Sequence, residues 1–105
     1  MMAWVYLMAA GLMEVVWATT LKKTDGWSHL GWSLLTAAAM AASFWFLAAA
    51  LREIPIGTAY AIWVGIGAIG VAAMGILIFG ESANPAKLGF LALIIVGIAG
   101  LKWAS

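Results

Sequence analysis

The sequence predicts an all-α integral membrane protein with four transmembrane helices in one domain. Two observations lead to this fold class. Of the 105 residues, 67% are hydrophobic and only 9% are charged, whereas a soluble domain is about half apolar and a quarter charged. The apolar residues also form four runs of about 20 residues, the helix length that crosses a hydrocarbon core of about 30 Å. The predicted spans are residues 3–21, 32–51, 57–79 and 86–103.

Each span ends at a recognisable signal. The first lacks the basic region and small-residue cleavage site of a signal peptide, so we expect it to be retained, and the polar stretch 22–29 follows it. The second, rich in Ala, ends before Pro55, which cannot continue a helix. Between the third and fourth spans, Asn84 is a candidate N-cap with Pro85 at the first helical position. Connections this short make the helices antiparallel neighbours.

The charges are few and nearly balanced across the membrane. The net charge of +1 gives no indication of a nucleic-acid partner. Arg52 and Lys102 fall on one side of the predicted bundle, and Lys22, Lys23 and Lys87 on the other. This is almost no bias under the positive-inside rule, so we predict insertion in both orientations and an antiparallel, dual-topology homodimer. The alternative is a single orientation with the first loop cytoplasmic.

Glu14 is the candidate functional residue, because it is an acid inside an otherwise apolar span. A carboxylate near the bilayer centre costs about 2.5–3.5 kcal/mol on insertion scales. Such residues usually mark pathways for protons or ions, so we interpret Glu14 as a proton- or cation-binding site. The remaining interpretation is a structural hydrogen bond between helices. An inverted second subunit would bring two Glu14 carboxylates to one central cavity, since sites between inverted repeats lie near the membrane midplane.

Polar and aromatic residues on the first three spans are candidates to surround Glu14. Gly11 leaves open volume one turn away, and Trp17 offers an indole N–H on the same face. On the second span, the hydroxyl of Ser43 is a possible donor to Glu14, although small polar residues equally serve as contacts between helices. On the third, Tyr60 and Trp63 need acceptors if buried, and the carboxylate is one. Space filling is the alternative for both tryptophans.

Glycines mark the third and fourth spans. Gly65 and Gly67 favour either a hinge in the third helix or close helix packing, and the sequence does not separate the two. On the fourth span, Gly89 and Gly97 lie on a smooth stripe suited to packing against a second copy of the chain. With no cysteine and no His within a span, we expect no metal, no cofactor and no enzymatic activity.

The chain resembles the small multidrug resistance family over its whole length. The family features are Glu14, the segment 55–63 (PIGTAYAIW) and the stripe 89–98 (GFLALIIVGI). Within the family it is similar to the guanidinium exporters, on four segments: 14–17 (EVVW), 65–68 (GIGA), 80–85 (GESANP) and 100–102 (GLK).

The resemblance implies an antiparallel homodimer in a bacterial inner membrane that exports guanidinium in exchange for protons. It implies Glu14 as the central acid, with a dimer contact on the fourth helix, where Gly89, Leu93 and Gly97 lie. Its implied hydrogen-bonding shell is Trp17, Ser43, Tyr60 and Trp63. Guanidinium derivatives with one polar substituent, such as guanylurea, are expected to fit. The alternatives are an exporter of hydrophobic quaternary ammonium cations and a non-transporting membrane subunit.

Overall fold

The computed structural model describes residues 2–104, which form four helices joined by three short connections. The helices are α1 (Met2–Lys23), α2 (Leu30–Ala50), α3 (Ile56–Leu77) and α4 (Pro85–Ala104). All four are long and apolar enough to cross a membrane. The predicted all-α membrane fold with four transmembrane helices is therefore confirmed, and each helix covers most of the range expected for it.

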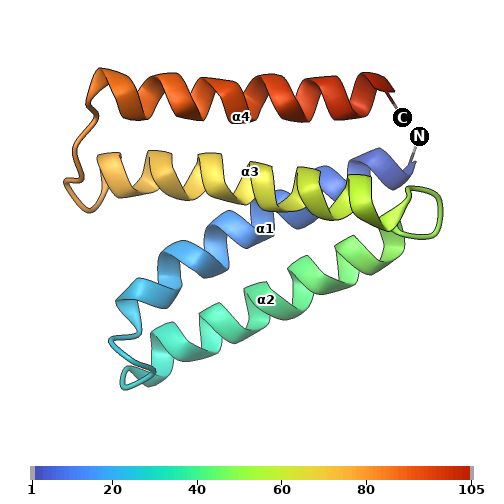
Figure 1. Ribbon diagram of the computed structural model, residues 1–105. Helices are drawn as coiled ribbons and strands as arrows, with labels where there is room; N and C mark the ends of the chain where they lie inside the picture. Colours follow the sequence, from blue (N-terminus) through green and yellow to red (C-terminus); the bar gives the residue numbers. More distant parts are fainter. Residues whose placement is uncertain (1, 105) are drawn as a thin grey trace.

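The helices form a thin layer. α1 packs against both α2 and α3, whereas α4 packs against α3, and Figure 1 shows α3 and α4 side by side with α1 crossing behind α3. The dimensions are 41 × 34 × 17 Å, so the subunit is much thinner than it is wide or long. A second contact holds the end of α4, where the Lys102 ammonium lies 5.0 Å from the centre of the Trp4 ring.

The buried core lies where α1 meets α2 and α3. Its members are mostly small or branched: Ala3, Leu7, Ala10, Ala50, Ile54, Ala59, Ile62 and Trp63. Two buried hydroxyls add a polar contact between α1 and α2, since Thr20 Oγ1 lies 2.7 Å from Thr36 Oγ1. Small residues and hydroxyls at helix contacts are typical of membrane bundles, where the lipid supplies no hydrophobic drive between helices.

The first connection is a tight turn built around Thr24. Three consecutive residues, Asp25, Gly26 and Trp27, have positive φ angles of 48°, 69° and 70°. The buried Thr24 holds them, because its hydroxyl accepts the amide of Trp27 at 3.1 Å and its carbonyl accepts the amide of His29 at 3.1 Å. These bonds replace the helical ones that the turn breaks, and they fix α2 antiparallel to α1.

The last connection carries a cap on each side. Gly80 has a φ of 70°, and the amide of Glu81 donates back to the carbonyl of Gly75 at 3.0 Å, so this bond caps the end of α3. On the other side, Asn84 Oδ1 accepts the amide of Lys87 at 2.8 Å and Pro85 is the first residue of α4. The N-cap predicted at Asn84 is therefore confirmed.

Candidate functional site

Glu14 lies on the face of α1 that meets α3. Its carboxyl rests directly on the backbone of Gly67, where a Cβ atom would overlap Oε1. Oε1 is buried and has no hydrogen-bond partner within residues 2–104. Because buried polar atoms in folded proteins are nearly always paired, this unpaired oxygen marks Glu14 as the candidate binding group.

Trp17 supplies a matching unpaired donor one turn further along α1. Its Nε1 is buried and lacks an acceptor in the part of the chain that the structure describes. The ring meets Phe44 of α2 edge-on, with centroids 6.3 Å apart. An acceptor and a donor, both buried and both unpaired, therefore lie on neighbouring turns of one helix.

Ser43 and Trp63 bond elsewhere than to Glu14. Of the two interpretations of Ser43, the subunit shows the contact between helices, because its hydroxyl donates to the backbone carbonyl of Ala10 at 2.7 Å. Trp63 Nε1 in turn donates to Ser43 Oγ at 3.0 Å. A hydroxyl has a single proton to donate, so in this arrangement Ser43 cannot also donate to Glu14. The two residues instead join α1, α2 and α3 by a buried chain of hydrogen bonds.

Tyr60 faces outward from the subunit. Its side chain is 56% exposed, and its ring is tilted against Trp63 with centroids 5.6 Å apart. The expected hydrogen bond to Glu14 is not made within residues 2–104. A tyrosine that projects from the subunit beside its site is placed to contact whatever covers that face.

Phe44 is the site residue that the sequence analysis missed. It lies between the two tryptophans, 6.3 Å from Trp17 and 6.0 Å from Trp63 by ring centroids, and it is 45% exposed. With Tyr60, the four rings form an aromatic row across α1, α2 and α3. Its position directly after Ser43 could have indicated it. An apolar aromatic residue in an apolar helix, however, does not differ enough from its neighbours to be noticed in the sequence.

The glycines of α1 and α3 are contact points. A Cβ on Gly11 would lie 2.6 Å from Ile66, and one on Gly65 would lie 2.7 Å from Ile98 of α4. α3 is helical from Ile56 to Leu77 without interruption. The structure thus has close packing at Gly65 and Gly67, the second of the two interpretations, while a hinge there stays a prediction.

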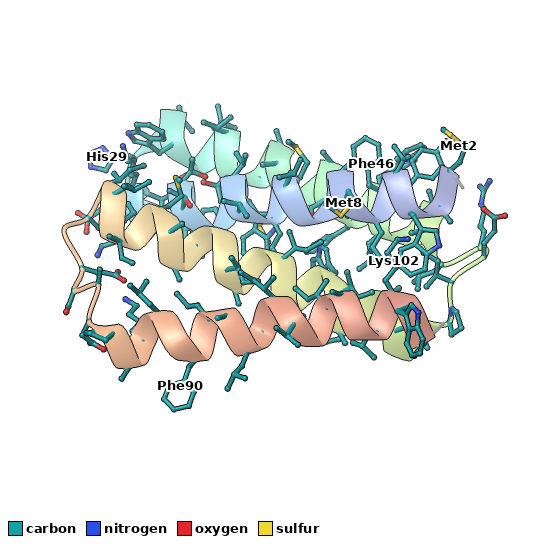
Figure 2. All side chains as sticks on the ribbon, turned by 90° about the horizontal axis from the view of Figure 1, so that it is seen from above. Met2, Met8, His29, Phe46, Phe90 and Lys102 are labelled. Carbon is teal, nitrogen blue, oxygen red and sulfur yellow. The ribbon has the colours of Figure 1, made fainter. Side chains whose placement is uncertain are left out.

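The stripe on α4 is unused inside the subunit. Within Pro85–Ala104 no residue is buried, and Leu93 is 63% exposed. A Cβ on Gly89 or Gly97 would meet nothing within 4 Å. Figure 2 shows Phe90 pointing away from the other helices, whereas Lys102 points toward α1.

Within residues 2–104, no three His, Cys, Asp or Glu side chains gather closely enough to hold a metal ion. The groups that the site does present are one carboxylate and one indole N–H, both with an unpaired buried atom, and a row of aromatic rings. A carboxylate attracts a cation, and aromatic faces add cation–π attraction. The arrangement is suited to a small cation that carries N–H donors.

Comparison with known proteins gives one consistent result. The family model described as Small Multidrug Resistance protein matches residues 2–94. A protein named guanidinium exporter from Escherichia coli strain K12 is 55% identical over 101 residues, which cover 96% of each chain. Proteins of the same name from Citrobacter freundii and Salmonella typhimurium are similar to the same extent.

Proposed function

Because the chain belongs to the small multidrug resistance family, we propose that it exports guanidinium and small guanidinyl cations in exchange for protons, by alternating access. It is a multi-pass protein of the bacterial inner membrane and a transporter rather than an enzyme. The observation that carries the proposal is the buried, unpaired Oε1 of Glu14, one helical turn from the unpaired Nε1 of Trp17. The relatives named guanidinium exporter support the choice of substrate.

The substrate matches the site in shape and charge. Guanidinium is a flat cation with N–H donors arranged as a fork, and a carboxylate accepts that fork through two parallel charge-assisted hydrogen bonds. Trp17, one turn along α1 from Glu14, meets Phe44 edge-on, and aromatic faces near the carboxyl would add cation–π attraction. Derivatives with one small polar substituent, such as guanylurea, keep the same fork and are expected to bind.

Exchange follows from a single carboxyl with two possible occupants. A proton on Glu14 removes the negative charge that holds guanidinium, so the two compete. An empty cavity with an unneutralised carboxylate is costly to enclose in low dielectric, whereas a protonated or cation-loaded one costs less. The transporter therefore changes its open side only when loaded, and proton entry drives guanidinium exit.

The active unit in this proposal is an antiparallel homodimer. A layer 17 Å thick encloses no pathway, and the Glu14 face needs a cover. A second, inverted copy supplies that cover and brings two Glu14 carboxyls to one cavity, with α4 against α4 along Gly89, Leu93 and Gly97. Tyr60 is exposed. In the dimer it would contact the partner subunit, and this contact would differ according to which side of the membrane the cavity faces.

The test is a flux measurement on purified protein in liposomes. With an acidic liposome interior, protons leaving the liposomes should drive guanidinium accumulation inside them. Guanidinium binding should weaken as the pH falls, by up to about tenfold per pH unit for each proton displaced. Binding that is independent of pH would contradict the shared site. Tetrapropylammonium is the comparison cation: larger currents with it than with guanidinium would favour a quaternary ammonium exporter. Failure of the chain to bind or transport either cation when purified alone would favour a subunit of a larger assembly.

A further inference from the structure

A hollow of about 190 Å³ lies on the surface of α2, beside the contact of Trp45 with Tyr6 of α1. It is lined by Trp45, Ala48, Ala49 and Arg52, residues spaced three to four apart and therefore stacked along one side of the helix. Ser43, which marks the opposite side of α2, is fully buried against α1. The hollow is thus separate from the Glu14 site, and no part of the proposed transport reaction uses it.

The wall of the hollow is held in place although it is exposed. Trp45 is 62% exposed, yet its ring makes edge contacts with Phe46 and with Tyr6 of α1, at centroid distances of 5.3 and 6.1 Å. Tyr6 also stacks on Phe46 at 6.1 Å. An exposed ring fixed by two neighbours forms a preorganised surface, which reduces the entropy lost when a ligand binds.

Arg52 closes one end of the hollow. It lies just beyond the last residue of α2, Ala50, and therefore at the level of the lipid headgroups if α2 spans the bilayer. No acid pairs with it within residues 2–104, where the one ion pair joins Lys87 to Glu81. Trp45 lies seven residues earlier, roughly 10 Å deeper along the helix. The hollow therefore runs from an unpaired guanidinium at the interface to an apolar floor inside the span.

We propose that this hollow binds one anionic phospholipid, with the phosphate on Arg52 and the first part of an acyl chain along Ala48, Ala49 and Trp45. The Arg52 fork matches two phosphate oxygens, which a lone ammonium would not do. The apolar floor selects a lipid over a free anion, since inorganic phosphate gains nothing from Trp45. The positive charge of Arg52 disfavours the cationic substrates proposed for the Glu14 site.

The experiment is native mass spectrometry of the purified protein with equal amounts of phosphatidylglycerol and phosphatidylcholine of the same chain length. Wild type should retain phosphatidylglycerol in preference. Arg52→Gln should lower that retention roughly tenfold, since bonds to a charged group are lost, and should leave phosphatidylcholine unchanged. Lys102→Gln is the matched control, because it removes a charge outside the hollow, near the C-terminus, which lies at the same end of the molecule as the α2–α3 connection (Figure 1).

A second pair of variants tests the floor. Ala48→Leu fills the hollow from an exposed position and should lower retention of both lipids, whereas Ala38→Leu adds the same bulk to an exposed position of α2 outside it. Gel filtration and circular dichroism check folding. The proposal is overturned if the two lipids are retained equally, if Lys102→Gln acts like Arg52→Gln, or if inorganic phosphate in millimolar excess displaces the lipid.

Discussion

The contact between α1 and α2 and the contact between α3 and α4 are built differently. α1 and α2 share buried polar bonds, Thr20 to Thr36 and Ser43 to the carbonyl of Ala10, both at 2.7 Å. α4 has no buried residue and meets α3 where Ile98 lies over Gly65. The first contact is held by side-chain hydrogen bonds, whereas α4 leaves most of its surface unused within the subunit.

The difference separates two tasks within one short chain. In a bilayer, helices are held by close packing and by hydrogen bonds, since lipid competes equally for apolar surface. The α1–α2 contact has both and fixes the helix that carries Glu14. The outer face of α4 has neither within the subunit, and it is the surface on which we propose that a second copy packs. Four substitutions test this division, beginning with the largest expected effect.

Glu14→Gln should remove coupled guanidinium transport without changing assembly. The change keeps the size of the side chain but loses a charge and two charge-assisted hydrogen bonds, worth more than about a hundredfold in binding. Guanidinium flux in liposomes and gel filtration measure the two effects. Glu53→Gln, an exposed acid outside the site, is the control and should transport normally. Substantial proton-driven flux in Glu14→Gln would refute the assigned role.

Gly97→Leu should separate the dimer while leaving the subunit folded. Nothing in the subunit lies within 4 Å of a Cβ at Gly97, so the added bulk meets only a partner. Overpacking costs about 1–3 kcal/mol, and both copies carry the change, so the dissociation constant should rise more than tenfold. Dilution-dependent crosslinking measures it. Gly31→Leu, also into open space, should have no effect; equal behaviour of the two variants would argue against the α4 interface.

Ser43→Ala should destabilise the α1–α2–α3 core rather than the dimer. It removes the acceptor of Trp63 Nε1 and the donor to Ala10, which in a membrane protein amounts to about 1–2 kcal/mol. Unfolding of the purified protein in mixed micelles measures this loss. Ser82→Ala, in the exposed last connection, serves as the comparison. An unchanged stability would mean that the three-helix hydrogen-bond chain contributes nothing.

Thr36→Val should have the smallest effect. It removes the hydrogen bond to Thr20 and keeps the shape of the side chain, so the expected loss is about 0.6 kcal/mol, the average for such bonds in membranes. The same unfolding measurement applies, and transport should continue. If Thr36→Val lowered the unfolding free energy more than Ser43→Ala does, the Thr20–Thr36 bond near the first connection would be the stronger of the two α1–α2 contacts.

The sequence predicted the spans and the central acid because each depends on composition at one place in the chain. Apolar runs of bilayer length define helices, and the acid at position 14 stands out inside one of them. Asn84 and Pro85 likewise form a cap through local bonds. These features need no knowledge of how the helices are rotated against one another.

The partners of the polar side chains could not be predicted in the same way. Ser43 bonds to a backbone carbonyl, and Trp63 bonds to Ser43, because the rotation of α2 places that hydroxyl between α1 and α3. Phe44 joins the aromatic row for the same reason. The rotation of each helix about its axis is set by the summed packing of many small residues. It cannot be predicted from the spacing of residues within one helix.

The 17 Å thickness of the subunit also has a genetic consequence. If two copies of one gene product make both walls of the pathway, every substitution is inherited by both walls at once. Selection then cannot adjust the entrance without adjusting the exit. A tandem fusion of two copies would release that constraint, since each wall could then diverge on its own.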